Sequence, residues 1–236
     1  MTVTVDRAEG APLAALARLS RRPAPPPVEE RCELCGLDVP DEHPHIVDID
    51  SRALLCACRA CGLLFPPEAA TGRYRGVPDR WVQVPVLALS SAQWDRLQIP
   101  VEVAFFFVNS PLDRVAAFYP GPAGATESLL DLESWGEVTA ANPHLAGLMP
   151  DVEAFLVRAS PGSERPGRAG GPVGREGYIV PVDACYELVG QLRQLWRGFD
   201  GGTEAHRALD AFFDRVRARA ARSAAPVAGP YGAETP

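Results

Sequence analysis

Lysine is absent from this chain of 236 residues, and all 23 of its basic residues are arginine. The formal net charge of −7 at pH 7 opposes contact with phosphate backbones, so we expect no nucleic-acid partner. The chain also lacks an apolar run of about eighteen residues and any segment that resembles a secretory signal. We therefore expect a cytoplasmic protein without a membrane span, in a compartment where disulfides are disfavoured.

Recognisable catalytic sets are missing as well. His144 and His206 are isolated in sequence from any serine or cysteine partner, and Cys185 lies on the apolar face of a predicted helix, where a packed thiol is expected. Residues 121–127 contain glycine but lack the Lys-Ser/Thr ending of a phosphate-binding loop, so they are predicted to form a turn. We name no catalytic or cofactor-binding residue and expect a non-enzymatic protein.

What the chain does contain is a pair of Cys-x-x-Cys-Gly units. Each unit can direct two thiolates at one ion, and the glycine after the second cysteine supplies the positive φ that such a turn often needs. Twenty-two residues separate Cys35 from Cys58, slightly more than the usual fifteen to twenty or so of a paired-knuckle zinc site. The sequence therefore predicts a metal site made of Cys32, Cys35, Cys58 and Cys61.

The predicted metal is zinc, because four soft sulfur ligands with no carboxylate among them favour a closed tetrahedral site. Iron is the alternative, since a rubredoxin uses the same pair of knuckles and tetrahedral sulfur sites serve both metals. Rubredoxin-like modules are rich in aromatic core residues, whereas residues 32–61 contain no Phe, Tyr or Trp. We therefore prefer zinc to iron.

The segment between the two knuckles is predicted to form a hairpin, with strands over 45–50 and 53–58. In the second strand Cys56 would share a face with Cys58 but lie roughly 6.6–7 Å from it, too far for an easy shared tetrahedron with Cys61. We predict that Cys56 is a neighbouring thiol. The alternative is that Cys56 takes the place of one of the four ligands.

His43 and His45 come at a two-residue spacing just before this hairpin. Either histidine could supply a ligand or a hydrogen bond to a thiolate. The other interpretation is that both only open a strand beside the site, because four cysteines already complete a tetrahedron. The second interpretation is favoured.

The metal module is acidic, since residues 31–65 contain three arginines and six carboxylates. Ribbons that bind nucleic acids normally need a basic face to neutralise phosphates. This charge balance predicts a ribbon that faces a protein partner.

Composition divides the chain into segments. We predict a disordered N-terminal segment over 1–31, a zinc-ribbon-like metal module over 32–66, a larger domain over 72–222 with a flexible insertion at 160–175, and a disordered tail over 223–236.

Within the larger domain, strands and helices mix without a βαβ rhythm. Strands are predicted over 81–89, 101–109, 114–119, 151–158 and 178–180. Helices are predicted over 90–97, 134–142, 181–196 and 203–222. The natural assembly is an α+β domain in which a mostly antiparallel sheet is covered by C-terminal helices.

Several stretches resemble an uncharacterised actinobacterial family that contains a zinc ribbon. They are Cys32–Gly36, His43-x-His45, Cys56–Phe65, Tyr119–Ser128 and Pro181–Gly190. The resemblance covers about residues 30–215. Members of that family are often encoded beside uptake nickel–iron hydrogenase genes, which implies a context for the protein and no reaction.

These patterns together predict a non-enzymatic accessory protein whose structural zinc ribbon docks onto a protein partner. The resemblance implies hydrogenase subunits or maturation factors as that partner. The alternative is a rubredoxin-like iron electron carrier associated with a hydrogenase.

Overall fold

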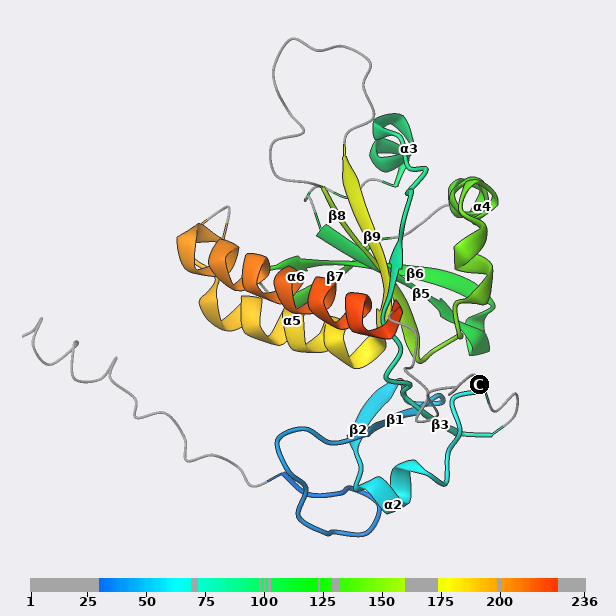
Figure 1. Ribbon diagram of the computed structural model, residues 1–236, viewed down its shortest axis with the longest axis vertical. Helices are drawn as coiled ribbons and strands as arrows, with labels where there is room; N and C mark the ends of the chain where they lie inside the picture. Colours follow the sequence, from blue (N-terminus) through cyan, green and yellow to red (C-terminus); the bar gives the residue numbers. More distant parts are fainter. Residues whose placement is uncertain are drawn as a thin grey trace, which may run out of the picture.

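The fold is described from a computed structural model, which covers residues 30–68, 72–97, 99, 101, 103–122, 124–128, 132–159, 174–198 and 201–224. A small three-stranded sheet lies at one end of a larger six-stranded sheet that carries helices (Figure 1). The predicted α+β class is confirmed. The predictions for residues 1–29, 160–173 and 225–236 lie outside the described residues.

The small module contains the predicted hairpin and one further strand. Strand β1 (His45–Asp48) pairs antiparallel with β2 (Ala53–Cys56) on one side and with β3 (Tyr74–Gly76) on the other. A short helix, α2 (Arg59–Gly62), follows β2. The sequence did not predict β3, which lies beyond the predicted end of the module.

The larger sheet is antiparallel at every pairing, as predicted, with strand order β4-β9-β8-β5-β6-β7. Its strands are β4 (Val82–Val84), β5 (Val103–Asn109), β6 (Arg114–Gly121), β7 (Gly124–Ser128), β8 (Glu153–Ala159) and β9 (Arg175–Pro181).

Two parts of this sheet differ from the sequence prediction. Strand β4 has three residues in place of the predicted nine, and Pro85, which has no N–H for a sheet ladder, follows it directly. Residues 124–127 belong to the turn predicted over 121–127, but together with Ser128 they form the edge strand β7, which pairs with β6. Strand β7 begins at Gly124, whose φ of +114° is a conformation that favours glycine.

Helices cover both faces of the larger sheet (Figure 1). The elements are α3 (Ser91–Arg96) and α4 (Leu132–Ala141) on one face, and α5 (Val182–Leu195) and α6 (Gly202–Ala224) on the other. Two 3-10 turns, η1 (Ser110–Leu112) and η2 (Pro143–Gly147), complete the described elements. Ser90 caps α3 through a reciprocal capping box with Gln93.

The apolar run of β5 serves both of these layers. Phe105 and Phe107 point into the core shared with α5 and α6, whereas Phe106 stacks on Trp135 of α4 with ring centroids 5.0 Å apart. Successive strand residues point to opposite faces, so a strand covered on both sides must be apolar throughout. The expected C-terminal helices therefore cover one face, and the other face is covered by α3 and α4.

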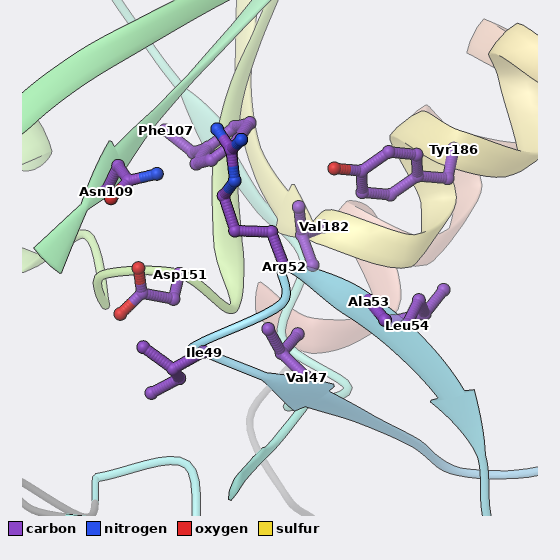
Figure 2. Close-up of a pocket in the computed structure, with 10 residues that line it drawn as sticks. All are labelled: Val47, Ile49, Arg52, Ala53, Leu54, Phe107, Asn109, Asp151, Val182 and Tyr186. Carbon is purple, nitrogen blue, oxygen red and sulfur yellow. The ribbon is translucent and has the colours of Figure 1, made fainter. Parts of the chain in front are cut away.

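The small module packs against the larger sheet through its hairpin. Val47 and Ile49 join the core that includes Phe107. A cavity of about 20 Å³ remains at this junction, and the Arg52 side chain extends from the hairpin turn toward Phe107, with Tyr186 on its other side (Figure 2).

A buried ion pair holds the same junction. Arg75 of β3 donates from Nη1 to Oδ2 of Asp151 at 3.1 Å, and the two side chains are only 10% and 7% exposed. Asp151 also accepts from the backbone N–H and the hydroxyl of Ser110. Because a buried charge needs such partners, the pair fixes β3 against the loop before β8.

Candidate metal centre

The fold brings the sulfur atoms of Cys32, Cys35, Cys58 and Cys61 within 4.8 Å of one another. These are the four residues that the sequence predicts as metal ligands. Cys32 and Cys35 lie in the loop before β1. Cys58 directly precedes α2, and Cys61 lies within that helix. The hairpin β1–β2 connects the two knuckles and brings them close together.

The sulfur spacing fits a tetrahedral metal site. The Sγ atoms of Cys35 and Cys58 are 3.8 Å apart. A tetrahedron with metal–sulfur bonds of about 2.3 Å has sulfur–sulfur edges of about 3.8 Å, whereas a disulfide bond is about 2.05 Å long. The two thiols are therefore spaced for a shared ion and not for a disulfide.

The first knuckle is shaped by backbone hydrogen bonds around a glycine. The N–H of Gly36 donates to the Cys32 carbonyl at 2.7 Å, and the N–H of Cys32 donates to the Leu37 carbonyl at 2.8 Å. Gly36 has φ +76°, as the Cys-x-x-Cys-Gly pattern predicted. This turn places the sulfurs of Cys32 and Cys35 on the same side of the loop.

The second knuckle is built differently. Cys58 is the N-cap of α2, and its Sγ accepts from the backbone N–H of Cys61 at 3.5 Å. Gly62 lies inside α2, so the predicted positive φ at this glycine is wrong. A Cβ at Gly62 would lie 3.0 Å from the Cβ of Pro44, so a side chain at this position would crowd the Pro44 ring.

The pKa values of two of these thiols, Cys32 and Cys61, are shifted in opposite directions. Backbone N–H groups, that of Cys58 first, lower the pKa of Cys32 to about 6. Hydrogen bonding with the Cys58 side chain, followed by burial, raises the pKa of Cys61 to about 12. A divalent cation between the sulfurs would stabilise the thiolate form of every cysteine that binds it.

Cys56 belongs to a different cluster. Its thiol and one ring nitrogen each of His43 and His45 lie within 4.8 Å of one another. Burial, then the charges of Glu30 and Glu33, raise the pKa of this thiol. The structure thus places Cys56 beside the four-cysteine cluster, as a neighbouring thiol, and it does not bring either histidine into that cluster.

The remaining candidates of the sequence lie elsewhere. Cys185 is fully buried in the core beneath α5, and burial, with a smaller effect of the Asp183 charge, raises its pKa well above the usual range. His144 and His206 are exposed. These positions agree with a packed thiol and two surface histidines.

Exposed leucines flank the four cysteines, a feature that the sequence reasoning missed. Leu34 and Leu37 are 38% and 60% exposed, and Leu63 and Leu64 are 77% and 70% exposed. The available signal was the leucine that directly follows each Cys-x-x-Cys-Gly unit. We call these four side chains the knuckle leucines.

Comparison with known proteins gives one match. The profile of a family of unknown function, DUF5947, matches residues 31–220, a span that includes both the four-cysteine module and the larger domain. No curated protein and no solved structure matches the chain. In the described part of the chain, no helix has the length and apolar character needed to cross a membrane.

Proposed function

The chain belongs to the family of unknown function DUF5947, and we propose that it is a non-enzymatic accessory protein whose zinc ribbon docks onto a protein partner. The observation that carries this proposal is the exposure of the knuckle leucines beside four clustered thiols. All four leucines lie within three residues of one of these cysteines in the chain, and exposed apolar surface is what a docking partner covers.

The role of the metal in this proposal is to hold the docking surface in shape. The module's own core is small, with Cys32, Ile46, Ala57 and Cys58 as its buried members. A segment with so few buried side chains depends on metal binding for its folding free energy. Zinc bound to four thiolates would therefore order the two loops that present the knuckle leucines.

The surface around the leucines suggests the chemistry of the partner. Glu33, Asp38, Asp41 and Glu42 are exposed in the loop before β1, which also presents Leu34 and Leu37. A complementary surface would have an apolar recess bordered by arginine or lysine. The resemblance noted in the sequence makes a nickel–iron hydrogenase subunit or maturation factor the first partner to test.

Co-purification tests the docking surface. Tagged protein, produced in cells that also express the candidate partner genes, should recover one stoichiometric partner under gentle conditions. The double variant Leu63→Asp/Leu64→Asp should lose that partner, because it places charge in the apolar contact. Val86→Asp is the matched control, since Val86 is 80% exposed but belongs to the larger domain, and it should keep the partner.

Recovery of no partner by the unaltered protein contradicts the proposal. Equal recovery by the Leu63→Asp/Leu64→Asp variant would move the docking surface away from the knuckles. In both cases the metal content of the variant is measured first, so that loss of the ion is not mistaken for loss of the contact.

Iron remains the competing occupant of the four-cysteine site, and one observation favours it: Cys35 is exposed, so an iron ion would lie near the surface, where electron transfer requires it. Elemental analysis and a visible spectrum of protein produced with both metals present decide between the two functions. Colourless protein with zinc and no iron supports the docking role. Coloured protein with a reversibly reducible iron supports the electron carrier instead.

A further inference from the structure

We propose that His43, His45 and Cys56 form a second metal site, separate from the four-cysteine cluster, for a borderline divalent transition-metal ion such as Zn²⁺. The ion would have three protein ligands and one position open to exogenous ligand. The cluster of two ring nitrogens and one thiol within 4.8 Å is the starting observation.

The backbone places the three side chains together. His45 of β1 lies directly opposite Cys56 of β2, and side chains of such cross-strand partners share one face of the sheet. His43 precedes His45 by two residues, and Pro44 between them restricts the residue before it to an extended conformation. In extended chain, residues two apart point to the same side.

The ring of His43 is oriented for binding an ion. Its Nδ1 lies 2.8 Å from the Pro40 carbonyl, which can only accept, so the proton belongs on Nδ1 and the lone pair on Nε2. The side chain is 3% exposed, and Nε2 has no hydrogen-bond partner among the described residues. A buried acceptor without a partner is costly, and a metal ion would satisfy it.

The ring of His45 is held by a carboxylate from the larger domain. Its Nδ1 lies 2.8 Å from Oδ2 of Asp183, which leaves Nε2 for a metal ion. The other carboxylate oxygen accepts from the backbone N–H of Ala184 in the first turn of α5. A carboxylate that fixes the far nitrogen of a histidine is the usual outer partner of a histidine metal ligand.

The ligand chemistry selects the class of ion. Two imidazoles and one thiolate suit zinc and its neighbours among the first-row transition metals, whereas magnesium and calcium require oxygen ligands. Three protein ligands leave one tetrahedral position for water or a small molecule, an arrangement typical of reactive zinc sites. Both histidines line a groove of about 370 Å³ between the small module and helices α5 and α6, so that position is within reach of solvent.

Zinc titration of the metal-free full-length chain, followed by elemental analysis, tests the site. The unaltered protein should bind two ions per chain. His43→Ala and Cys56→Ala should each bind one, because two protein ligands cannot hold the ion tightly. His144→Ala, which alters an exposed histidine, should still bind two. One ion in the unaltered protein, or two in both ligand variants, overturns the proposal.

Cobalt substitution identifies which ion is lost. Co²⁺ bound by four thiolates has absorption bands that differ from those of a site with two imidazoles and one thiolate. His43→Ala should keep the four-thiolate spectrum and lose the other component. Loss of the four-thiolate component instead would mean that the histidine supports the first site, and the second site would be rejected. His43→Gln, which preserves size, serves if the alanine variant does not fold.

Asp183 is a positioning residue in this proposal. Asp183→Asn should weaken binding of the second ion by roughly 10–100-fold, because the histidine loses the carboxylate that orients it. Affinity of the four-cysteine site should not change. An unaltered second-site affinity in Asp183→Asn, measured by competition with a chelator, would remove Asp183 from the site.

Discussion

In the part of the chain that the structure describes, the buried carboxylates of Asp48, Asp151 and Glu153 each pair with an arginine, and the geometry of the guanidinium explains why. Arg80 donates from Nε and Nη2 to the two oxygens of Glu153, both at 2.6 Å, and the Glu153 side chain is fully buried. A guanidinium can make this two-pronged contact, whereas a lysine ammonium binds as a single point charge. We therefore expect arginine-to-lysine changes at such positions to destabilise the protein.

Asp48 provides the first prediction, which concerns pH. Hydrogen bonds from Arg73 hold the pKa of this carboxyl well below its usual range. A carboxyl with a depressed pKa in the folded state contributes stability above its unfolded pKa, near 4, and loses it as pH falls toward the folded value. The thermal midpoint of Asp48→Asn should thus lie below that of the unaltered protein at pH 7.

The difference between these two midpoints should narrow as pH is lowered from about 4. Melting curves of both proteins from pH 7 to pH 2.5 measure it, with the exposed pair member Asp38→Asn as a control whose midpoint should shift little. A difference that is constant over the whole range would show that the Asp48 charge does not contribute through Arg73.

At the level of elements, strands with strong local patterns were predictable, and those defined only by their pairing were not. Strand β5 is an apolar run, and β6 follows it across a short turn, so both were predicted. Strand β7 has the sequence GATES, which has little apolar character, and only its pairing with β6 makes it a strand. The same holds for β3, whose three residues pair with β1.

The two candidate sites also differ in whether the sequence could predict them. The four-cysteine set was predictable because the ligand spacing lies within each knuckle. The grouping of Cys56 with two histidines was not predicted, since it depends on the register between β1 and β2. Asp183 could not be linked to His45 from sequence at all, because 138 residues separate them.

Strand β3 provides a second prediction, through Gly76. A Cβ at Gly76 would lie 2.2 Å from the carbonyl oxygen of Phe65, a backbone atom that cannot move alone. Gly76→Ala should therefore displace β3 from β1 and lower the thermal midpoint by several degrees, because the clash must be relieved by backbone movement.

Gly36→Ala is the matched comparison. This glycine has a positive φ, but no heavy atom lies within 4 Å of a Cβ built there. The expected cost is the conformational strain alone, on the order of 1 kcal/mol. Differential scanning calorimetry of the two variants should rank Gly76→Ala as the more damaging; the reverse ranking would show that β3 adapts to the side chain.

At the level of the whole molecule, the cysteine knuckles have a small core of their own, whereas Val47 and Ile49 of the hairpin pack into the core of the larger domain. Cys61→Ser should remove the ion from the four-cysteine site and unfold the ribbon, since metal binding in zinc-finger peptides is worth about 10–16 kcal/mol. The larger domain, with both faces of its sheet covered, should still melt cooperatively. Elemental analysis, calorimetry and limited proteolysis of residues 30–68 measure the three effects.

Cys56→Ser is the control for this experiment, because Cys56 lies outside the four-cysteine cluster and its variant should keep that ion. Full metal content in Cys61→Ser would mean that the ligand assignment is wrong at this position. A loss of the cooperative melt would show that the larger domain cannot fold without the ribbon.

The order of the strands has a consequence for synthesis on the ribosome. Strand β4 pairs with β9, and β5 pairs with β8, so the larger sheet joins segments from early and late parts of the chain. The cysteine knuckles and their hairpin, by contrast, emerge complete within the first third of translation. Because local contacts form before distant ones, the nascent ribbon can acquire its ion while the rest of the chain is still being made. The contact between His45 and Asp183 must wait for α5, so a newly synthesised chain would load its two metal sites in a fixed order.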